Sequence, residues 1–559
     1  MKPALAAAIG LAGLAFFTTV YPACGDPFAQ QAYLKALNTG AGDNFGASTA
    51  ISGNTVVVGA PYEDSNATGV NGNPDNNGAL DSGAAYVYVR DGEYWVRQAY
   101  LKASNTGAGD LFGWSVAISG DTVVVGAWGE SSGATGVNGD GNNNRARRSG
   151  AAYVFVREGT NWTQQAYLKA SNTGGPPGDD MGDRFGMSVA VSGDTAIVGA
   201  WLEDSAATGV DGDQNDDNAP NSGAAYVFRR TGTRWAQEAY LKAGNSGPFL
   251  GFGWAVAVGQ DTAVVGAGAG LLNSGGAYIF RRSGTEWVED AYLTGSNVQD
   301  AEDAKQFGHA VGISGGTVVV GAPFDSSSSA GVNGPEEDTG APESGAAYVF
   351  VRSNTAWTRQ AYLKASNTGS GDRFGQTVAL DGDLLVIGAP REDCASAGVN
   401  LDQTNDNASN AGAAYLFKRE GTGWSQLAYL KASNTGTDDL FGEAVSISSD
   451  TLIVAAPGES SNATGVNGDQ GSNHAAAAGA AYVFSSQALR PDLVIAQSGR
   501  QVALAWPVTA DGFALEWSAS VGSPASWHLE PTPPAIVGDQ NVVTLEVGAA
   551  ARFFRLRKP

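Results

Sequence analysis

Acidic and amide side chains recur at three fixed places along most of this 559-residue chain. A carboxylate stands two residues after each of six Gly-Ala-Pro-like triplets, at Glu63, Glu130, Glu203, Asp325, Glu392 and Glu459. An Asn or Asp follows each Gly-Val pair, at Asn71, Asn138, Asp211, Asn333, Asn400 and Asn467. An aspartate lies two residues before five Phe-Gly pairs, at Asp43, Asp110, Asp183, Asp372 and Asp439. Such oxygen ligands suit calcium, so these positions are candidate calcium sites.

A second interpretation needs no metal. Each carboxylate can accept hydrogen bonds from the backbone N–H groups of its own loop, as side chains do in turns and caps. Nothing in the chain matches the spacing of an EF-hand loop, and the acid-rich stretch from Val210 lacks the terminal glutamate of that motif. The sequence leaves both interpretations open, and calcium is the one cofactor that it suggests.

The acidic segments have a constant length. From the third residue of the triplet through the next strand-like run, six units span 28 residues each, as in 61–88 and 128–155. Insertions without structure would drift in length, so we expect ordered loops. The unit around Phe252 has a short loop and carries Leu250 at the aspartate position, and the unit around Phe307 carries Lys305 there. The strand-like runs persist in both units, so we expect the loops to serve something other than the fold.

Two tryptophans, Trp128 and Trp201, replace proline where acidic segments begin. Exposed there, they could stack on a sugar or on a partner's side chains, and packing within the protein is the alternative. Neighbouring acids such as Glu392 and Asp393 resemble a glycosidase pair. They recur in several units, however, whereas an enzyme needs one asymmetric site. We therefore assign no catalytic residue and expect a protein that is not an enzyme.

The elements that must position these residues form a repeat. Phe-Gly pairs stand at Phe45-Gly46, Phe112-Gly113, Phe185-Gly186, Phe252-Gly253, Phe307-Gly308, Phe374-Gly375 and Phe441-Gly442. Each pair opens four strand-like runs, which in the second unit are 112–119, 121–127, 150–157 and 162–170. Four antiparallel strands repeated seven times predict an all-β, seven-bladed β-propeller. A β-solenoid is the alternative.

The ends of the repeat fit together. The chain starts its repeat with "FAQQAYLK" at 28–35, a fourth strand without the other three, and the last unit stops after its third strand. We therefore expect the N-terminal strand to complete the last blade, closing the ring in a three-plus-one arrangement without exposed edges.

The paired motifs resemble FG-GAP repeats, which form the propeller of integrin alpha subunits and occur in many exported bacterial proteins. Phe-Gly is the first half of the motif, and Gly59-Ala60-Pro61, Gly321-Ala322-Pro323 and Gly388-Ala389-Pro390 show the second half most fully. The resemblance implies a ligand-binding or adhesion scaffold. The connection between the two halves, such as 52–55, is too short for the calcium loop of integrin-type repeats, so that site does not carry over.

Composition and the N-terminal residues limit the possible partners and the cellular location. A net charge of −24 argues against nucleic acid or anionic membrane as a partner. Residues 1–25 read as a signal peptide, with lipidation at Cys24 as an alternative, and no other stretch could span a bilayer. We expect a propeller over 26–487 and a small fibronectin-III-like β-sandwich over 488–559, with a sorting or anchoring role for the latter.

The sequence thus predicts a secreted or surface-attached monomer that binds an extracellular protein or glycan. A polysaccharide-acting enzyme and a structural surface-layer protein are the alternatives.

Overall fold

The computed structural model describes residues 28–486 apart from 93, 174–180, 269–274 and 296–304. Beyond them it describes 493–498, 500–508, 513–519, 527–538, 540–546 and 552–557. The predicted signal peptide therefore lies outside the described residues. The chain divides into a large compact unit, Ala29–Ser485, and a small one that includes Ser486–Pro559. Within the part that is described, no helix is long and apolar enough to cross a membrane.

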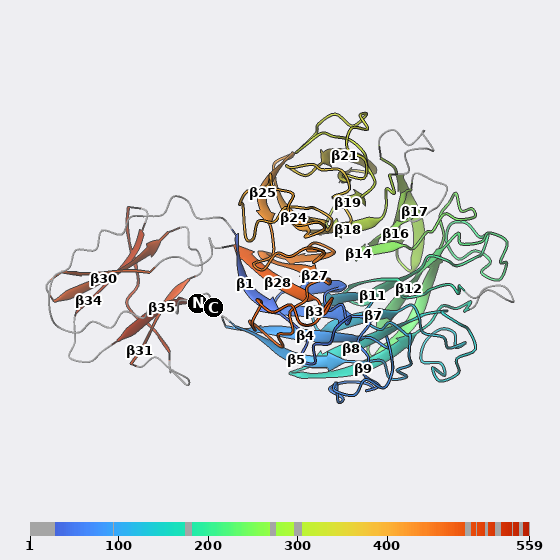
Figure 1. The fold of residues 1–559 in the computed structure, drawn as a ribbon, viewed down its shortest axis with the longest axis horizontal. Coiled ribbons are helices and arrows are strands. Elements are labelled where there is room, and N and C mark those ends of the chain that lie inside the picture. The colour runs from blue at the N-terminus through green and yellow to red at the C-terminus, as the bar shows by residue number, and fades with distance from the viewer. Residues whose placement is uncertain are drawn as a thin grey trace. The chain divides into compact units, whose positions relative to one another are not determined.

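The large unit consists of seven four-stranded antiparallel sheets, here named sheets I to VII (Figure 1). Sheet I contains β2 (Ser48–Ser52), β3 (Thr55–Ala60), β4 (Ala84–Asp91) and β5 (Tyr94–Leu101). Sheet II contains β6 (Ser115–Ser119), β7 (Thr122–Ala127), β8 (Ala151–Glu158) and β9 (Asn161–Leu168). Sheet III contains β10 (Ser188–Ser192), β11 (Thr195–Ala200), β12 (Ala224–Thr231) and β13 (Arg234–Leu241). Sheet IV contains β14 (Ala255–Gly259), β15 (Thr262–Gly266), β16 (Ala277–Ser283) and β17 (Glu286–Leu293).

The remaining three sheets follow the same order. Sheet V contains β18 (Ala310–Ser314), β19 (Thr317–Ala322), β20 (Ala346–Ser353) and β21 (Ala356–Leu363). Sheet VI contains β22 (Thr377–Asp381), β23 (Leu384–Ala389), β24 (Ala413–Glu420) and β25 (Gly423–Leu430). Sheet VII contains β26 (Ala444–Ser448), β27 (Thr451–Ala456) and β28 (Ala480–Ser486), and its fourth strand is β1 (Phe28–Leu34).

The two halves of the repeated motif meet at the seam between successive sheets. The second strand β7 is buried along its whole length, as its apolar run requires. A Cβ on Gly126 at its end would lie 2.1 Å from the carbonyl oxygen of Gly186, the Phe-Gly glycine of sheet III. Only glycine permits this approach, and Gly186 itself has φ 90°. The motif therefore marks where one backbone packs directly on the next.

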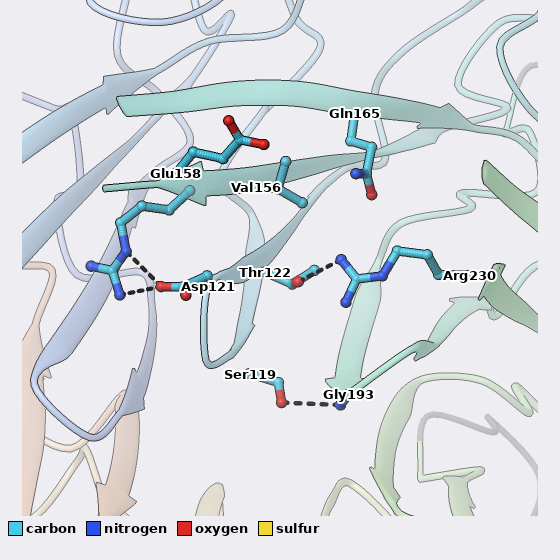
Figure 2. Close-up of a pocket in the computed structure, with 9 residues that line it drawn as sticks. Ser119, Asp121, Thr122, Val156, Glu158, Gln165, Gly193 and Arg230 are labelled. Carbon is cyan, nitrogen blue, oxygen red and sulfur yellow. Dashed lines mark hydrogen bonds and ion pairs between the residues drawn. The ribbon is translucent and has the colours of Figure 1, made fainter. Parts of the chain in front are cut away.

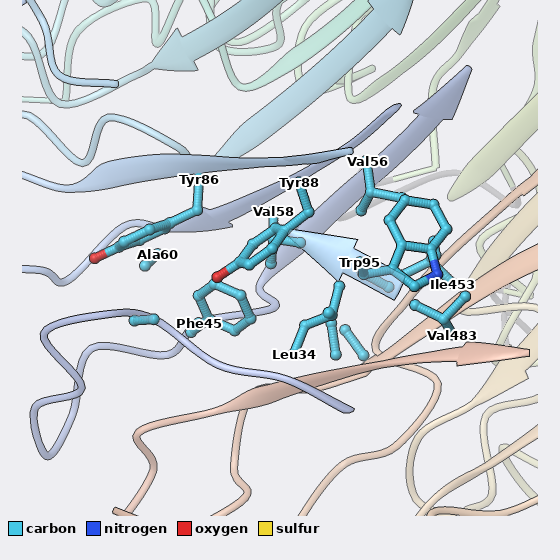
Figure 3. Packing of buried hydrophobic residues seen from close by; sticks show 14 of the residues in the cluster. Leu34, Phe45, Val56, Val58, Ala60, Tyr86, Tyr88, Trp95, Ile453 and Val483 are labelled. Atoms are coloured by element: carbon cyan, nitrogen blue, oxygen red, sulfur yellow. The ribbon is translucent and has the colours of Figure 1, made fainter. Parts of the chain in front are cut away.

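Sheet VII packs against sheet I in the same way as the other neighbours pack. Leu34, Ile453 and Val483 belong to sheet VII, and they lie in one buried cluster with Val56 and Trp95 of sheet I (Figure 3). The first strands of consecutive sheets contact one another, and β26 contacts β2. A segment near the start of the chain thus completes a sheet and a core formed near the end of the repeat.

In sheets I to V a bulge in the fourth strand supplies a hydrogen bond to the next sheet. In β5 the register with β4 shifts, so that Val87 pairs with Ala99, Tyr88 pairs with Arg97, and Gln98 is left over. The side chain of Gln98 accepts a hydrogen bond of 2.8 Å from Nε1 of Trp162 in sheet II. The same bond joins Trp235 to Gln165 and Trp424 to Gln360. The bulge places an acceptor where the neighbouring indole needs one.

Between sheets VI and VII, both residues of this tryptophan–acceptor pair are missing. Phe28 stands where all six other fourth strands carry tryptophan, and a phenyl ring has no N–H to donate. Leu427 stands at the bulge position of the preceding sheet, between the paired residues Gln426 and Ala428, and it has no acceptor. Donor and acceptor are thus both missing at the same pair of positions.

The small unit holds two further sheets. One has the order β29-β30-β34-β33, formed by Val494–Ser498, Gln501–Pro507, Gln540–Glu546 and Ala535–Val537. The other has the order β32-β31-β35, formed by His528–Leu529, Ala514–Ser518 and Phe553–Arg557. Both sheets contribute to one cluster around Leu504, Trp506, Leu515 and Val543.

The bulge bond predicts a specific coupling between neighbouring sheets. Gln165→Leu should destabilise the protein by about 1–2 kcal/mol, because the buried N–H of Trp235 loses its acceptor. In the double variant Gln165→Leu with Trp235→Phe, which copies the Leu427 and Phe28 combination, the two effects should be non-additive by about 1 kcal/mol. Chemical denaturation of the wild type, both single variants and the double variant measures this. Strict additivity would show that the bond contributes nothing.

Candidate functional site

The repeated glutamate lies in a buried polar network at the base of each acidic loop. Glu63 is 1% exposed, and its Oε2 accepts a hydrogen bond of 2.9 Å from Nζ of Lys102 at the end of the fourth strand. Its Oε1 accepts from Tyr100 Oη at 2.9 Å and from Asn38 Nδ2 at 2.8 Å. The ammonium group also donates to Oγ of Ser82, at the far end of the same loop, at 2.8 Å. The network therefore ties both ends of the loop to the fourth strand.

The ion pair recurs in all sheets but one. The pairs are Lys102–Glu63, Lys169–Glu130, Lys242–Glu203, Lys364–Asp325, Lys431–Glu392 and Lys35–Glu459. In sheet V the shorter aspartate lies 3.5 Å from Lys364 and 3.0 Å from Lys305, the residue that replaces the usual aspartate before Phe-Gly. Burial alone raises the pKa of Asp325, but the two ammonium groups hold it below its usual range.

The Asx residues after Gly-Val attach the loop to the edge of the sheet. Asn71 has φ 56°, donates its backbone N–H to the carbonyl of Tyr100 at 2.8 Å, and accepts the N–H of Tyr100 on Oδ1 at 2.9 Å. The same exchange occurs at Asn138, Asp211, Asn333, Asn400 and Asn467. Each loop therefore pairs with the outer edge of the fourth strand through one backbone bond and one side-chain bond, and it caps that edge as a short additional strand would.

Sheet IV shows the fourth strand without its loop. Thr294 stands where the other sheets carry lysine, and Leu250 stands at the aspartate position. Tyr292, the counterpart of Tyr100, is 45% exposed, whereas Tyr100 is 1% exposed. Lysine, carboxylate and long loop are thus absent together while the four strands remain. The network holds the loop in place and is not needed to form the sheet.

The aspartates before Phe-Gly are buried and cap a turn. Asp110 is 6% exposed and accepts the backbone N–H of Gly107 at 2.7 Å. Burial, reinforced by the charge of Glu130, raises the pKa of Asp110 to about 7. Burial likewise raises the pKa of Asp43 and Asp372 to about 7 and that of Asp439 to about 6. Asp183 is also buried, at 2% exposure.

The geometry of the repeated carboxylates bears on the calcium interpretation. Among the described residues, no three His, Cys, Asp or Glu side chains are grouped so that they could hold a metal ion. At each repeated carboxylate a lysine ammonium already lies where a cation would bind. At Glu63, tyrosine and asparagine donors take up further lone pairs. These residues do not have the free oxygen set that calcium needs. Calcium binding stays a prediction.

Trp128 and Trp201 lie at the ends of β7 and β11, partly buried among other aromatic rings. Trp128 meets Trp114 edge to face, with 5.5 Å between ring centroids, and Trp201 meets Trp254 in the same way at 4.9 Å. The guanidinium of Arg184 lies 4.6 Å from the ring centroid of Trp128 and 5.5 Å from that of Trp201. Both predicted residues thus belong to one aromatic group, which the sequence did not reveal.

A groove of about 340 Å³ lies between sheets II and III at the other end of their strands (Figure 2). Its polar groups bond to the sheets themselves. Arg157 pairs with Asp121 at 2.7 Å, Arg230 donates to Thr122 at 2.8 Å, and Gly193 donates to Ser119 at 3.0 Å. Arg230 also lies over the ring of Trp235. The groove is therefore a seam between sheets, and the loop-bearing end remains the candidate site.

The sequence pattern did not point to the lysines as site residues, because a strand that ends in lysine, as "AYLK" does, is typical of a solvated outer strand. In the structure Lys102 is fully buried. A signal existed: the one unit without a carboxylate after its triplet is also the one with "AYLT" in place of "AYLK". When two residue types are missing from the same unit of a repeat, they are expected to contact each other in the other units.

Removing the ammonium should destabilise the protein. Lys102→Met leaves Glu63 buried without its partner, and we expect a loss of about 3–5 kcal/mol in the free energy of unfolding. Lys102→Met combined with Glu63→Gln should recover much of that loss. Lys418→Met, which removes a lysine that is 46% exposed, is the control and should change little. Denaturant melts measure all three, and an equal effect of both lysine substitutions would contradict the buried-pair interpretation.

The buried aspartates predict an unusual pH dependence. Because the folded-state pKa of Asp110 is about 7 and the unfolded value is lower, the native state binds the extra proton. Its contribution to stability is therefore fully present below about pH 4 and is lost as the pH rises through 7. Asp110→Asn should be more stable than the wild type by about 2 kcal/mol at pH 8, with the difference shrinking toward pH 4.

Thermal melts at several pH values measure this difference, with the exposed Asp75→Asn as control. A difference that does not change with pH would overturn the interpretation.

Comparison with known proteins agrees with the repeat. The model of the FG-GAP repeat matches seven times, at residues 28–88, 95–155, 162–228, 235–280, 287–350, 357–417 and 424–484. No curated protein matches the chain. Among solved structures, a putative 6-phosphogluconolactonase from Bacteroides fragilis aligns with 11% identity and a TM-score of 0.40, over 74% of this chain and 97% of the other. Each match runs from the fourth strand of one sheet into the third strand of the next. Because the seven matches cover most of the chain, the protein belongs to the FG-GAP repeat family.

Proposed function

We propose that this protein is an extracellular or cell-surface binding scaffold. Its seven sheets are the blades of a closed propeller, in which β1 supplies the fourth strand of the last blade. The end of the propeller that carries the acidic loops presents the binding surface for a protein or glycan ligand. The proposal makes the protein non-catalytic and monomeric, exported by the predicted signal peptide at 1–25.

The observation that carries the proposal is the construction of the acidic loops. Six loops of equal length leave the same end of the blades, and a buried ion pair holds the base of each one. Sheet IV forms its four strands without such a loop, so the fold does not require them. A set of ordered loops on a rigid framework is the usual construction of a binding surface.

The negative charge of most loops disfavours a polyanion as the general ligand of this surface. Exposed loop acids, such as Asp75 and Asp217, make most of the surface negative. Such a surface favours a neutral or cationic partner. Calcium dependence remains part of the proposal as an experimental variable, since exposed loop acids could bind calcium on ligand engagement. The buried carboxylates, each paired with lysine, would not take part.

The small unit has a separate role in this proposal. Its two sheets share one core, as in a β-sandwich, and it follows the last blade in the chain. We propose that it sorts or anchors the protein, so that the propeller is held outside the cell. This part rests on the order of the units in the chain and on the fibronectin-III-like strand pattern.

A binding screen with matched surface variants tests the proposal. The mature protein is recovered from the medium or surface of the producing cell, which tests export, and is applied to arrays of extracellular proteins and glycans with calcium or with EDTA. Asp75→Lys with Asp217→Lys changes two exposed loop acids. Glu158→Lys with Glu420→Lys makes the same charge change at hairpins on the other end of the blades.

We expect a ligand whose binding the loop variant weakens by about fivefold or more, with the hairpin variant unchanged. Absence of any ligand, or equal loss in both variants, would contradict the assignment of the loop-bearing end. Equal binding in calcium and in EDTA would remove calcium from the proposal.

A further inference from the structure

The long loop of sheet II differs in charge from the other five long loops. The twelve-residue segment that ends each long loop carries one to four acids and no Lys or Arg in five sheets, at 72–83, 212–223, 334–345, 401–412 and 468–479. The equivalent segment of sheet II, 139–150, carries Arg145, Arg147 and Arg148 against a single aspartate, a net charge of +2. Among the six long loops, that of sheet II therefore forms a sector of opposite charge, and a selective ligand requires such a difference.

One arginine of this sector, Arg148, lies beside an aromatic ring. The guanidinium of Arg148 lies 5.9 Å from the ring centroid of Trp128, and the carbonyl of Arg148 accepts the backbone N–H of Arg184 at 3.1 Å. Arg184 in turn lies over both Trp128 and Trp201. Arg145 is exposed and lies shortly before Arg148 in the sequence. Cation and ring faces are thus presented together from sheets II and III.

The rings continue beyond this pair as a series. Ring contacts run from Tyr62 to Trp114 at 6.5 Å, from Trp114 to Trp128 at 5.5 Å, from Trp201 to Trp254 at 4.9 Å and from Trp254 to His309 at 5.4 Å. All these rings are partly buried, so each keeps some surface in water.

Two of the rings carry donors that the packing does not use. The Nε1 atoms of Trp128 and Trp201 are buried and have no hydrogen-bond partner among the described residues. A core built for stability alone rarely leaves such donors unpaired.

From this arrangement we propose that the sector formed by Arg145, Arg148, Trp128 and Trp201 binds a carboxylated sugar, a uronic-acid unit of an acidic polysaccharide. The inference rests on the proposed function and names the ligand class for one part of its surface.

Each feature of the sector matches one feature of that ligand. The apolar face of a pyranose ring stacks on an aromatic face, and a guanidinium binds a carboxylate through two parallel hydrogen bonds. A series of rings spread over several sheets suits a chain of sugar units better than a single small anion. The acidic loops elsewhere on the surface repel a polyanion, so its carboxylates bind at this sector.

Calorimetry with the full mature protein at low salt tests the inference. The probes are polygalacturonate and its fully methyl-esterified form, which has the same sugar backbone without the charge. The charge variant is Arg145→Gln with Arg148→Gln, and the matched control is Arg97→Gln with Arg234→Gln, two exposed arginines on fourth strands. Trp128→Leu tests the stacking, and thermal unfolding of every variant shows that it is folded.

We expect polygalacturonate to bind at least about tenfold more tightly than the esterified form. The Arg145 and Arg148 variant should lose that difference, the control should keep it, and Trp128→Leu should weaken both probes. Equal binding of both probes, or equal loss in the control, would overturn the inference. If polygalacturonate does not bind while another array ligand binds the loop-bearing end, this inference fails and the proposed function stands. If no ligand binds, both fail.

Discussion

The fold of the loop-bearing end depends on one interaction, a lysine ammonium paired with a carboxylate out of contact with water. Such a pair gains little net stability, because removing two charges from water costs nearly as much as their attraction returns. Its value lies in specificity. Lys102 can be buried only if Glu63 is placed opposite it, and Asn38, which donates to Glu63, and Ser82, which accepts from Lys102, fix the position of the pair further. The loop has one acceptable path, and its length is constant for that reason.

This constraint also explains why the loops of neighbouring sheets form one surface. Asn38 lies in the link that enters sheet I, yet it donates to Glu63 and accepts from Tyr86 at 2.7 Å. Each network therefore includes a residue of the segment joining two sheets. The side chains that hold a loop also hold the orientation of adjacent sheets, and a ligand that spans two loops meets a preorganised geometry.

The sequence predicted the repeated elements well and the site less well. Seven units of four strands follow from residue periodicity and from the Phe-Gly pairs, because burial on both faces leaves a clear apolar pattern in strands such as β7. The partners of Glu63 could not be read this way. Lys102 is 39 residues away in the chain, and a lysine at a strand end looks the same whether it faces water or a buried carboxylate.

The aromatic group could not be read from the sequence for a related reason. Arg184 contacts Trp128 of the preceding sheet, and Trp201 contacts Trp254 of the following sheet, so these contacts form only through the arrangement of the sheets.

The placement of β1 has a consequence for how the protein is made. Tyr33 bonds to Glu459, a residue 426 positions later, so the first strand to be synthesised is among the last to find its partners. Contacts this distant in the chain are slow to form, and during the delay both β1 and the edge of β28 remain open to other strands. Once β1 has paired with β28 that edge is covered, so the risk of aggregation falls on the nascent chain and not on the folded protein.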